Sequence, residues 1–130
     1  MSTTMPTSPS ANASAAELDR ALERLRRFGG DTLVRDMIDL FLEHAPKRIA
    51  ASRRALAAND LASVRLAVHS LVSSCAQLGA EQMRRLSAEA EQALVTDQGA
   101  LAALLEALER EFAIVQPQLV AARPTGQAAS

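Results

Sequence analysis

One apolar stripe between residues 60 and 80 limits the possible folds of this chain more than any other feature. Its large apolar residues recur at separations of 3, 4, 3, 4 and 3 positions, the spacing of one face of an α-helix. They are Leu61, Val64, Val68, Leu71, Cys75 and Leu78. Asp60 can accept hydrogen bonds from the first turn, and Gly79 can adopt the left-handed conformation that ends a helix. The segment therefore predicts a helix with one buried face, which has to pack against other elements.

The sequence before this stripe predicts two helices. A short one is expected to begin at Ser14, where Glu17 completes a capping box, and to end at residues 28–30. The next is expected to begin at Asp31. Pro46 lacks a backbone donor and crowds the preceding turn, so this second helix should kink or break nearby.

The sequence after the stripe predicts two more helices. One covers residues 80–96, and the other begins at Leu101 and should kink or end at Pro117. Aromatic residues make up only 2% of the chain, so its core is built mainly from Leu, Ala and Val, which favours helices over strands. Since short turns join these segments, we predict an all-α protein: an up-down-up-down four-helix bundle with a short extra N-terminal helix.

The chain of 130 residues is long enough for one domain with a core of its own. Residues 1–13 carry no charged side chain and are rich in Ser, Thr and Pro, so we expect a disordered N-terminal tail. The predicted bundle then covers residues 14–121, and residues 122–130 are expected to form a disordered C-terminal tail.

Charge, hydropathy and cysteine content narrow the classes of partner and compartment. A formal net charge of −1 argues against nucleic-acid binding. No apolar run approaches the roughly 20 residues that span a bilayer, so no membrane association is expected. The single cysteine, Cys75, falls on the buried stripe, which is typical of a reducing compartment. We therefore expect a cytoplasmic protein, and we expect it to be a monomer.

His69 lies next to the buried stripe, turned about 100° from Val68 around the helix axis. A histidine in such a position is most often a surface residue without a function. The residues around His69 favour a functional role. Small residues follow on the same helix: Ser70, Ser73, Ala76 and Ala80. No Asp or Glu occurs at positions 61–80, so an incoming phosphoryl group is expected to meet no local anionic repulsion.

The segment from His69 to Ala80 resembles the phosphorylation motif of the histidine phosphotransfer (HPt) domains of bacterial phosphorelays. That motif is His-x-Leu-Lys-Gly-Ser-Ser-x-x-Leu-Gly-Ala, and this chain has His-Ser-Leu-Val-Ser-Ser-Cys-Ala-Gln-Leu-Gly-Ala. Three upstream blocks are also similar to the family: Phe-Gly-Gly-Asp at 28–31, Asp-Leu-Phe-Leu at 39–42 and Ala-Leu-Ala-Ala-Asn-Asp-Leu at 55–61. The resemblance covers residues 15–121. Three positions differ: Val72 stands for the family's lysine, Ser73 for its glycine and Cys75 for its second serine.

This resemblance implies that His69 is a phosphoacceptor that passes a phosphoryl group between aspartates of response-regulator receiver domains. A sensor or hybrid histidine kinase would be the other partner. Arg65 and Ser73 would lie near the phosphate, and Val72 and Ala76 would belong to the docking surface. The chain would be a phosphocarrier without kinase activity of its own and without a cofactor, because the receiver domain brings the Mg²⁺.

Two other interpretations remain open. The chain could be a helical-bundle module that docks to a receiver domain or kinase without phosphotransfer, because the motif lysine is lost at Val72. A self-dimerising fragment of a histidine kinase is less favoured, since no ATP-binding region follows. The sequence has no glycine-rich phosphate loop and no Cys/His set with metal-ligand spacing. His44 is interpreted as a surface histidine near the expected kink rather than as a second active site.

Overall fold

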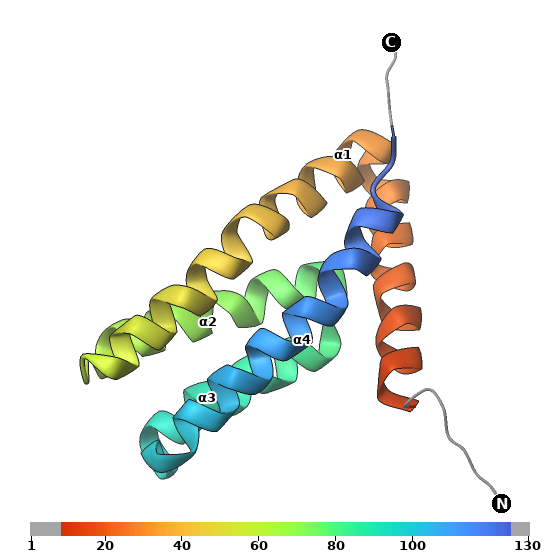
Figure 1. The fold of residues 1–130 in the computed structure, drawn as a ribbon. Helices are drawn as coiled ribbons and strands as arrows, with labels where there is room; N and C mark the ends of the chain where they lie inside the picture. Colours follow the sequence, from red (N-terminus) through yellow and green to blue (C-terminus); the bar gives the residue numbers. More distant parts are fainter. Residues whose placement is uncertain (1–8, 126–130) are drawn as a thin grey trace, which may run out of the picture.

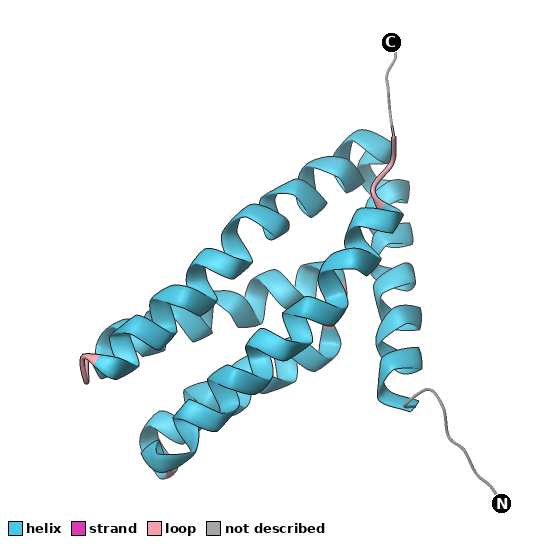
Figure 2. Ribbon diagram, viewed as in Figure 1, coloured by secondary structure: helices cyan, strands magenta, loops and turns pink. Residues whose placement is uncertain are grey.

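The computed structural model describes residues 9–125, with side chains from Ala15 onward, and this part of the chain is helical with short turns (Figures 1 and 2). Its elements are α1 (Pro9–Ala57), α2 (Leu61–Leu78), α3 (Glu81–Thr96), a 3₁₀ turn (Gln98–Ala100) and α4 (Leu101–Ala122). Each helix packs on the next, and α4 returns to α1, so that α2 and α4 lie diagonally across the bundle. The predicted all-α four-helix bundle is confirmed.

α1 consists of two helical segments that meet at Gly30. The backbone of Gly30 has φ 74° and ψ −170°, a conformation that glycine adopts without a steric penalty. The N-terminal segment therefore crosses one end of the bundle, while the second segment runs along α2 (Figure 1). The crossing segment is the predicted extra helix, and it buries Leu18, Ala21 and Leu22.

The extra helix begins earlier than the sequence predicted. It starts at Pro9 rather than at the expected cap Ser14, so residues 9–13 are helical instead of belonging to a tail. Proline is favoured at the first position of a helix, because its missing N–H would have no partner there. Residues 1–8 of the predicted tail lie outside the described part of the chain.

Neither internal proline ends its helix. α1 continues through Pro46 to Ala57, and α4 continues through Pro117 to Ala122. The interpretation in which Pro46 divides the second segment into two helices is therefore wrong. Packing outweighs the lost hydrogen bond: Ala45 and Ile49 on either side of Pro46 are buried, and so is Leu119 after Pro117.

α2 has the buried face that its apolar spacing predicted. Five of the six stripe residues are at most 1% exposed, and Leu61 is half-buried. Asp60 caps the helix by accepting hydrogen bonds from the Ser63 N–H at 3.2 Å and the Ser63 hydroxyl at 2.6 Å. These bonds hold the pKa of the Asp60 carboxyl below its usual value. Gly79 ends the helix with φ 72°, as expected.

The end of α4 is tied to the second segment of α1. Arg123 donates from Nε to Asp39 Oδ1 at 2.6 Å and from Nη2 to Oδ2 at 2.9 Å. This two-bond pairing lowers the pKa of the Asp39 carboxyl. Arg123 was assigned to a disordered tail, but this contact and the burial of Leu119 hold the chain in place up to that point. Residues 126–130 of the predicted tail lie outside the described residues.

Candidate functional site

His69 projects from a helix that is held firmly at both ends and along one face. α2 is capped by Asp60 and Gly79, and its stripe packs into the core of the bundle. The His69 side chain is 69% exposed, so the predicted outward orientation is confirmed. An exposed ring on a rigid helix can meet a partner without the helix having to rearrange.

Glu91 of α3 holds one nitrogen of the His69 ring. The distance from His69 Nδ1 to Glu91 Oε2 is 2.7 Å, and the Glu91 side chain is 27% exposed. A carboxylate can only accept a hydrogen bond, so Nδ1 carries the proton in the neutral ring. The lone pair of that ring is then on Nε2, the nitrogen on the other side of the ring. This arrangement leaves Nε2 available for reaction with a group that arrives from solvent.

This contact overturns the expectation that the ring has no anionic neighbour. α2 itself contains no Asp or Glu, but α3 contributes one across the interface between the two helices. The expectation considered only positions 61–80, and it failed because the nearest carboxylate comes from another helix.

A signal for Glu91 was nevertheless present in the sequence. Two antiparallel helices joined by a tight turn place residues opposite each other when they are equally distant from the turn. The turn lies at Gly79 and Ala80, so the position opposite His69 is about residue 90 or 91. Treating α2 and α3 as a helical hairpin would have brought Glu91 into the site.

The other predicted site residues lie on successive turns of α2 around His69. Arg65, Ser73 and Ala76 are exposed, and Val72 is half-buried. Arg65 forms no ion pair or hydrogen bond with any residue of the described part of the chain, so its guanidinium is available to a ligand. Ala80 is only 1% exposed and therefore does not belong to the surface that its small size suggested.

Leu66 is a second feature that the sequence reading missed. It lies three residues before His69 on α2, and it is 70% exposed. Residues three apart on a helix are neighbours on its surface, so Leu66 places apolar area directly beside the imidazole. Exposed apolar area of this kind is typical of surfaces that bind other proteins.

Neither a metal site nor a membrane-spanning helix is found in residues 9–125. No three His, Cys, Asp or Glu side chains in this range are close enough together to hold a metal ion. No helix in the same range combines the length and the apolar character that a bilayer crossing requires.

The fold and the site define a class of protein: a helical bundle with an exposed histidine on a rigid helix, one ring nitrogen of which is held by a carboxylate. The Hpt domain family model matches residues 36–122, and the chain belongs to this family. Its structure is similar to the crystal structure of histidine-containing phosphotransfer protein B (HptB) from Pseudomonas aeruginosa PAO1, with a TM-score of 0.78 and 27% sequence identity. That match covers 84% of this chain and 95% of HptB. No curated protein sequence matches the chain. The family that the motif suggested is confirmed.

Proposed function

We propose that this chain is a histidine phosphotransfer protein of a phosphorelay, and that His69 carries the phosphoryl group between aspartates of receiver domains. Membership of the Hpt family and the similarity to HptB support the role. The hydrogen bond between His69 and Glu91 is the observation that carries the assignment to this residue, because it leaves Nε2 free to react.

The proposed reaction is a reversible exchange of one bond for another. His69 Nε2 attacks the phosphorus of an aspartyl phosphate, an N–P bond forms, and the bond from phosphorus to the aspartate oxygen breaks. The aspartate leaves as a carboxylate, and Nδ1 keeps its proton against Glu91. In the second half of the relay, an aspartate of another receiver attacks the same phosphorus and releases the imidazole. Such transfers depend mainly on positioning and on stabilisation of charge.

The charges around His69 disfavour long-lived storage of the phosphoryl group on the ring. Arg65 offers a cation one turn away, and Ser73 offers a hydroxyl on the other side. The Glu91 carboxylate lies against the ring, and Val72 contributes no charge where the family has a lysine. A phosphoryl group on His69 would therefore have an anion close by and few cations to hold it.

The partners follow from the reaction. A receiver domain supplies the aspartate and the Mg²⁺ that neutralises the transferred group, and a sensor or hybrid kinase supplies the phosphoryl group at the start of the relay. We propose that the chain acts as a monomer and in the cytoplasm, where a free thiol such as Cys75 is stable.

The test begins with a panel of receiver domains from the source organism, each charged with acetyl phosphate and Mg²⁺. After mixing with the full chain, labelled phosphate should appear on it in the acid-labile form that is typical of phosphohistidine. His69→Gln should abolish this labelling while the circular dichroism spectrum and melting temperature stay unchanged, since the ring is exposed. His44→Gln is the matched control for the acceptor, because His44 is the other histidine of the chain and is also exposed, and it should still accept labelled phosphate.

Two outcomes would contradict the proposal. If the His69→Gln protein still accepts phosphate, another residue is the acceptor. If a receiver binds the wild-type chain tightly but no phosphate passes, the chain is a docking module, and the loss of the motif lysine at Val72 would be the first explanation to examine.

A further inference from the structure

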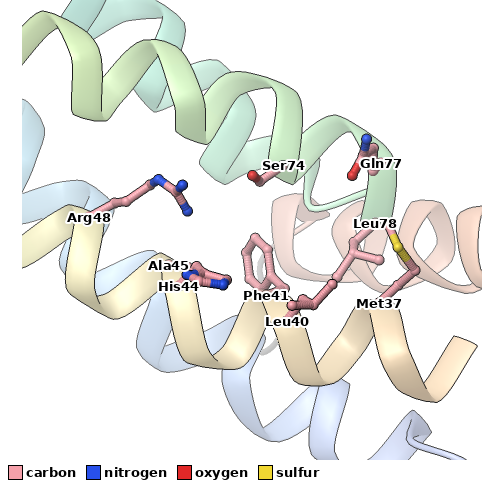
Figure 3. Close-up of a pocket in the computed structure, with 9 residues that line it drawn as sticks. All are labelled: Met37, Leu40, Phe41, His44, Ala45, Arg48, Ser74, Gln77 and Leu78. Carbon is pink, nitrogen blue, oxygen red and sulfur yellow. The ribbon is translucent and has the colours of Figure 1, made fainter.

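A groove between the second segment of α1 and the C-terminal half of α2 has the size of a small-molecule site (Figure 3). Its volume is about 360 Å³, within the range of roughly 300–1,000 Å³ that is typical of pockets for small ligands. Phe41 and Leu78 form its floor and are almost completely buried. This floor offers apolar area to the apolar part of a ligand.

The two ends of the groove differ in chemistry. Arg48 and Ser74 lie at one end (Figure 3). Met37 and Leu78 lie at the other end, and the Phe41 ring lies between the two ends (Figure 3). The groove therefore suits an elongated ligand with one polar end and one apolar end.

The polar end offers hydrogen-bond donors that have no partner in the protein. Arg48 is half-buried, and neither its guanidinium nor the Ser74 hydroxyl forms an ion pair or hydrogen bond with any residue between 9 and 125. No carboxylate lines the groove, and Glu43, the nearest acidic residue before Arg48 in the sequence, is paired with Lys47. A half-buried guanidinium of this kind favours a ligand that brings a carboxylate and accepts two parallel hydrogen bonds.

We infer that this groove binds a small organic acid with an aromatic or other apolar body. Its carboxylate pairs with Arg48 and accepts a hydrogen bond from the Ser74 hydroxyl, and its body lies on Phe41. An aromatic body suits this floor, because two rings attract each other in offset or edge-to-face arrangements. Arg48 is the one Lys or Arg side chain among the residues that line the groove, so its single charge matches one carboxylate.

The bound acid would also affect the site at His69. Ser74 is five residues after His69, which is about 8 Å along the helix axis. A protein that binds at His69 through an ordinary interface covers about 800 Å² on this chain, a patch of roughly 16 Å radius. The acid therefore competes with the phosphotransfer partner for this face. This regulatory part depends on the proposed function, whereas the binding of the acid does not.

The binding test uses hydrocinnamate, a phenyl ring joined to a carboxylate by two methylene groups, as the probe. Calorimetric titration of the full chain should give a dissociation constant of about 1 mM or lower, which is ordinary for a ligand of this size. Hydrocinnamamide has the same body without the charge and should bind at least about fivefold more weakly. Backbone amide resonances that shift with the acid should be those of the groove, including Phe41 and Gln77.

Arg48→Gln tests the assigned anion site. It should weaken binding of hydrocinnamate at least about fivefold and should leave the weak binding of the amide unchanged, because it removes only the charge partner. Arg110→Gln is the matched control, since Arg110 is exposed on α4, across the bundle from α2, and it should bind the acid like the wild type. Melting temperatures establish that both variants are folded.

The competition test uses the His69→Gln chain and the receiver domain that charges the wild-type chain. This variant cannot accept phosphate under the proposed function, so its dissociation constant for the receiver reports docking alone. Hydrocinnamate at ten times its own dissociation constant should weaken that docking about tenfold, by mass action. The amide at the same concentration should have a smaller effect, in proportion to its weaker binding.

Four results would overturn the assigned ligand site. They are no binding of the acid at about 10 mM, equal binding of acid and amide, equal binding to Arg48→Gln and the wild type, and a dimer that Leu40→Asp dissociates in sedimentation velocity. In the last case the groove holds a second copy of this chain. If the acid binds in the groove but receiver docking is unchanged, the regulatory part is wrong and the ligand site stands. If no receiver passes phosphate to the chain, the proposed function and the regulatory part fail together, and the titrations still decide the ligand site.

Discussion

At the scale of single residues, the reactivity of the site depends on a hydrogen bond between two helices. Glu91 fixes which nitrogen of His69 carries the proton, and it limits rotation of an exposed ring. Glu91 does not touch the incoming phosphoryl group in this arrangement, so we regard it as a positioning residue.

Glu91→Ala should slow single-turnover phosphotransfer roughly five- to tenfold, because a hydrogen bond worth about 1 kcal/mol is lost. Glu91→Gln keeps an accepting oxygen and should retain most of the rate. Nitrogen chemical shifts of the imidazole should show a mixture of tautomers in Glu91→Ala and one tautomer in the wild type. Glu89→Ala, at an exposed position two residues away on α3, is the control. Wild-type rate and tautomer in Glu91→Ala would show that the contact has no positioning role.

Val72 is the site residue that differs most from the family motif. A lysine there would extend from a half-buried position toward solvent and could approach the phosphoryl oxygens. After hydration and side-chain entropy are subtracted, its net effect is about 1 kcal/mol. We therefore expect Val72→Lys to transfer phosphate several-fold faster once bound, and to bind its receiver less tightly because apolar docking area is lost.

Arg65→Ala tests the same argument from the opposite direction. It should slow transfer, because Arg65 is a cation of this face with no partner in the described structure. Single-turnover kinetics and a binding titration separate the two effects, with Arg110→Ala on α4 as the control. If neither Val72→Lys nor Arg65→Ala changes the rate of transfer, the reaction is limited by docking geometry and not by nearby charge.

At the scale of elements, the end of α2 and the crossing segment of α1 hold each other in place. Gly79 has φ 72°, and a Cβ atom there would lie 2.4 Å from the carbonyl oxygen of Glu17 and 2.8 Å from Cβ of Ala21. Glycine is therefore needed for two reasons, the left-handed backbone and the close approach of another helix.

Gly79→Ala should destabilise the protein by more than about 2 kcal/mol, the sum of backbone strain and a clash with the backbone of α1. Two other glycines serve as comparisons. Gly30 has φ 74° with ψ −170°, a region of backbone conformation that is open essentially only to glycine, and a Cβ atom there would have no neighbour within 4 Å, so Gly30→Ala should cost only backbone strain, about 1–3 kcal/mol. A Cβ atom at Gly99 would lie 3.4 Å from its nearest neighbour, so Gly99→Ala should leave the stability nearly unchanged. Urea denaturation measures all three, and a loss at Gly79 no larger than about 1 kcal/mol, the cost of a left-handed backbone alone, would show that the close approach is unimportant.

At the scale of the whole molecule, all the helices contribute to one core, which encloses Cys75 completely. Burial raises the pKa of the Cys75 thiol to about 12. The thiol is therefore neutral and unreactive at pH 8, and it becomes available only when the bundle opens. Because an exposed thiol ionises at lower pH than this buried one, the contribution of Cys75 to stability is complete below about pH 9 and declines as the pH rises toward 12.

The labelling of Cys75 by a disulfide reagent at pH 8 should be at least about a thousand-fold slower in buffer than in denaturant, as expected for a domain of ordinary stability. Ser73→Cys provides an internal control, since it adds an exposed thiol to the same helix. In that variant one thiol should react quickly with the reagent and the other slowly. Two fast equivalents in buffer would mean that the α2 stripe is not packed as described.

The amino-acid sequence by itself determined the elements and the exposed histidine of this protein. The spacing of the α2 stripe, with Asp60 and Gly79 at its ends, establishes a helix with one buried face, and His69 has to lie off that face. These features depend on residues within a few turns of one another, which is why periodicity and capping predict them. The HPt motif was readable for the same reason, because its residues are consecutive on one helix.

Only the tertiary structure decided what surrounds that histidine and where the helices end. Glu91 reaches His69 from α3, and the groove at Arg48 exists because α1 and α2 lie side by side. Packing also keeps α1 helical through Pro46, although proline disfavours the interior of a helix. Contacts between helices sum many small apolar contributions from distant positions, and these outweigh a single residue's local preference.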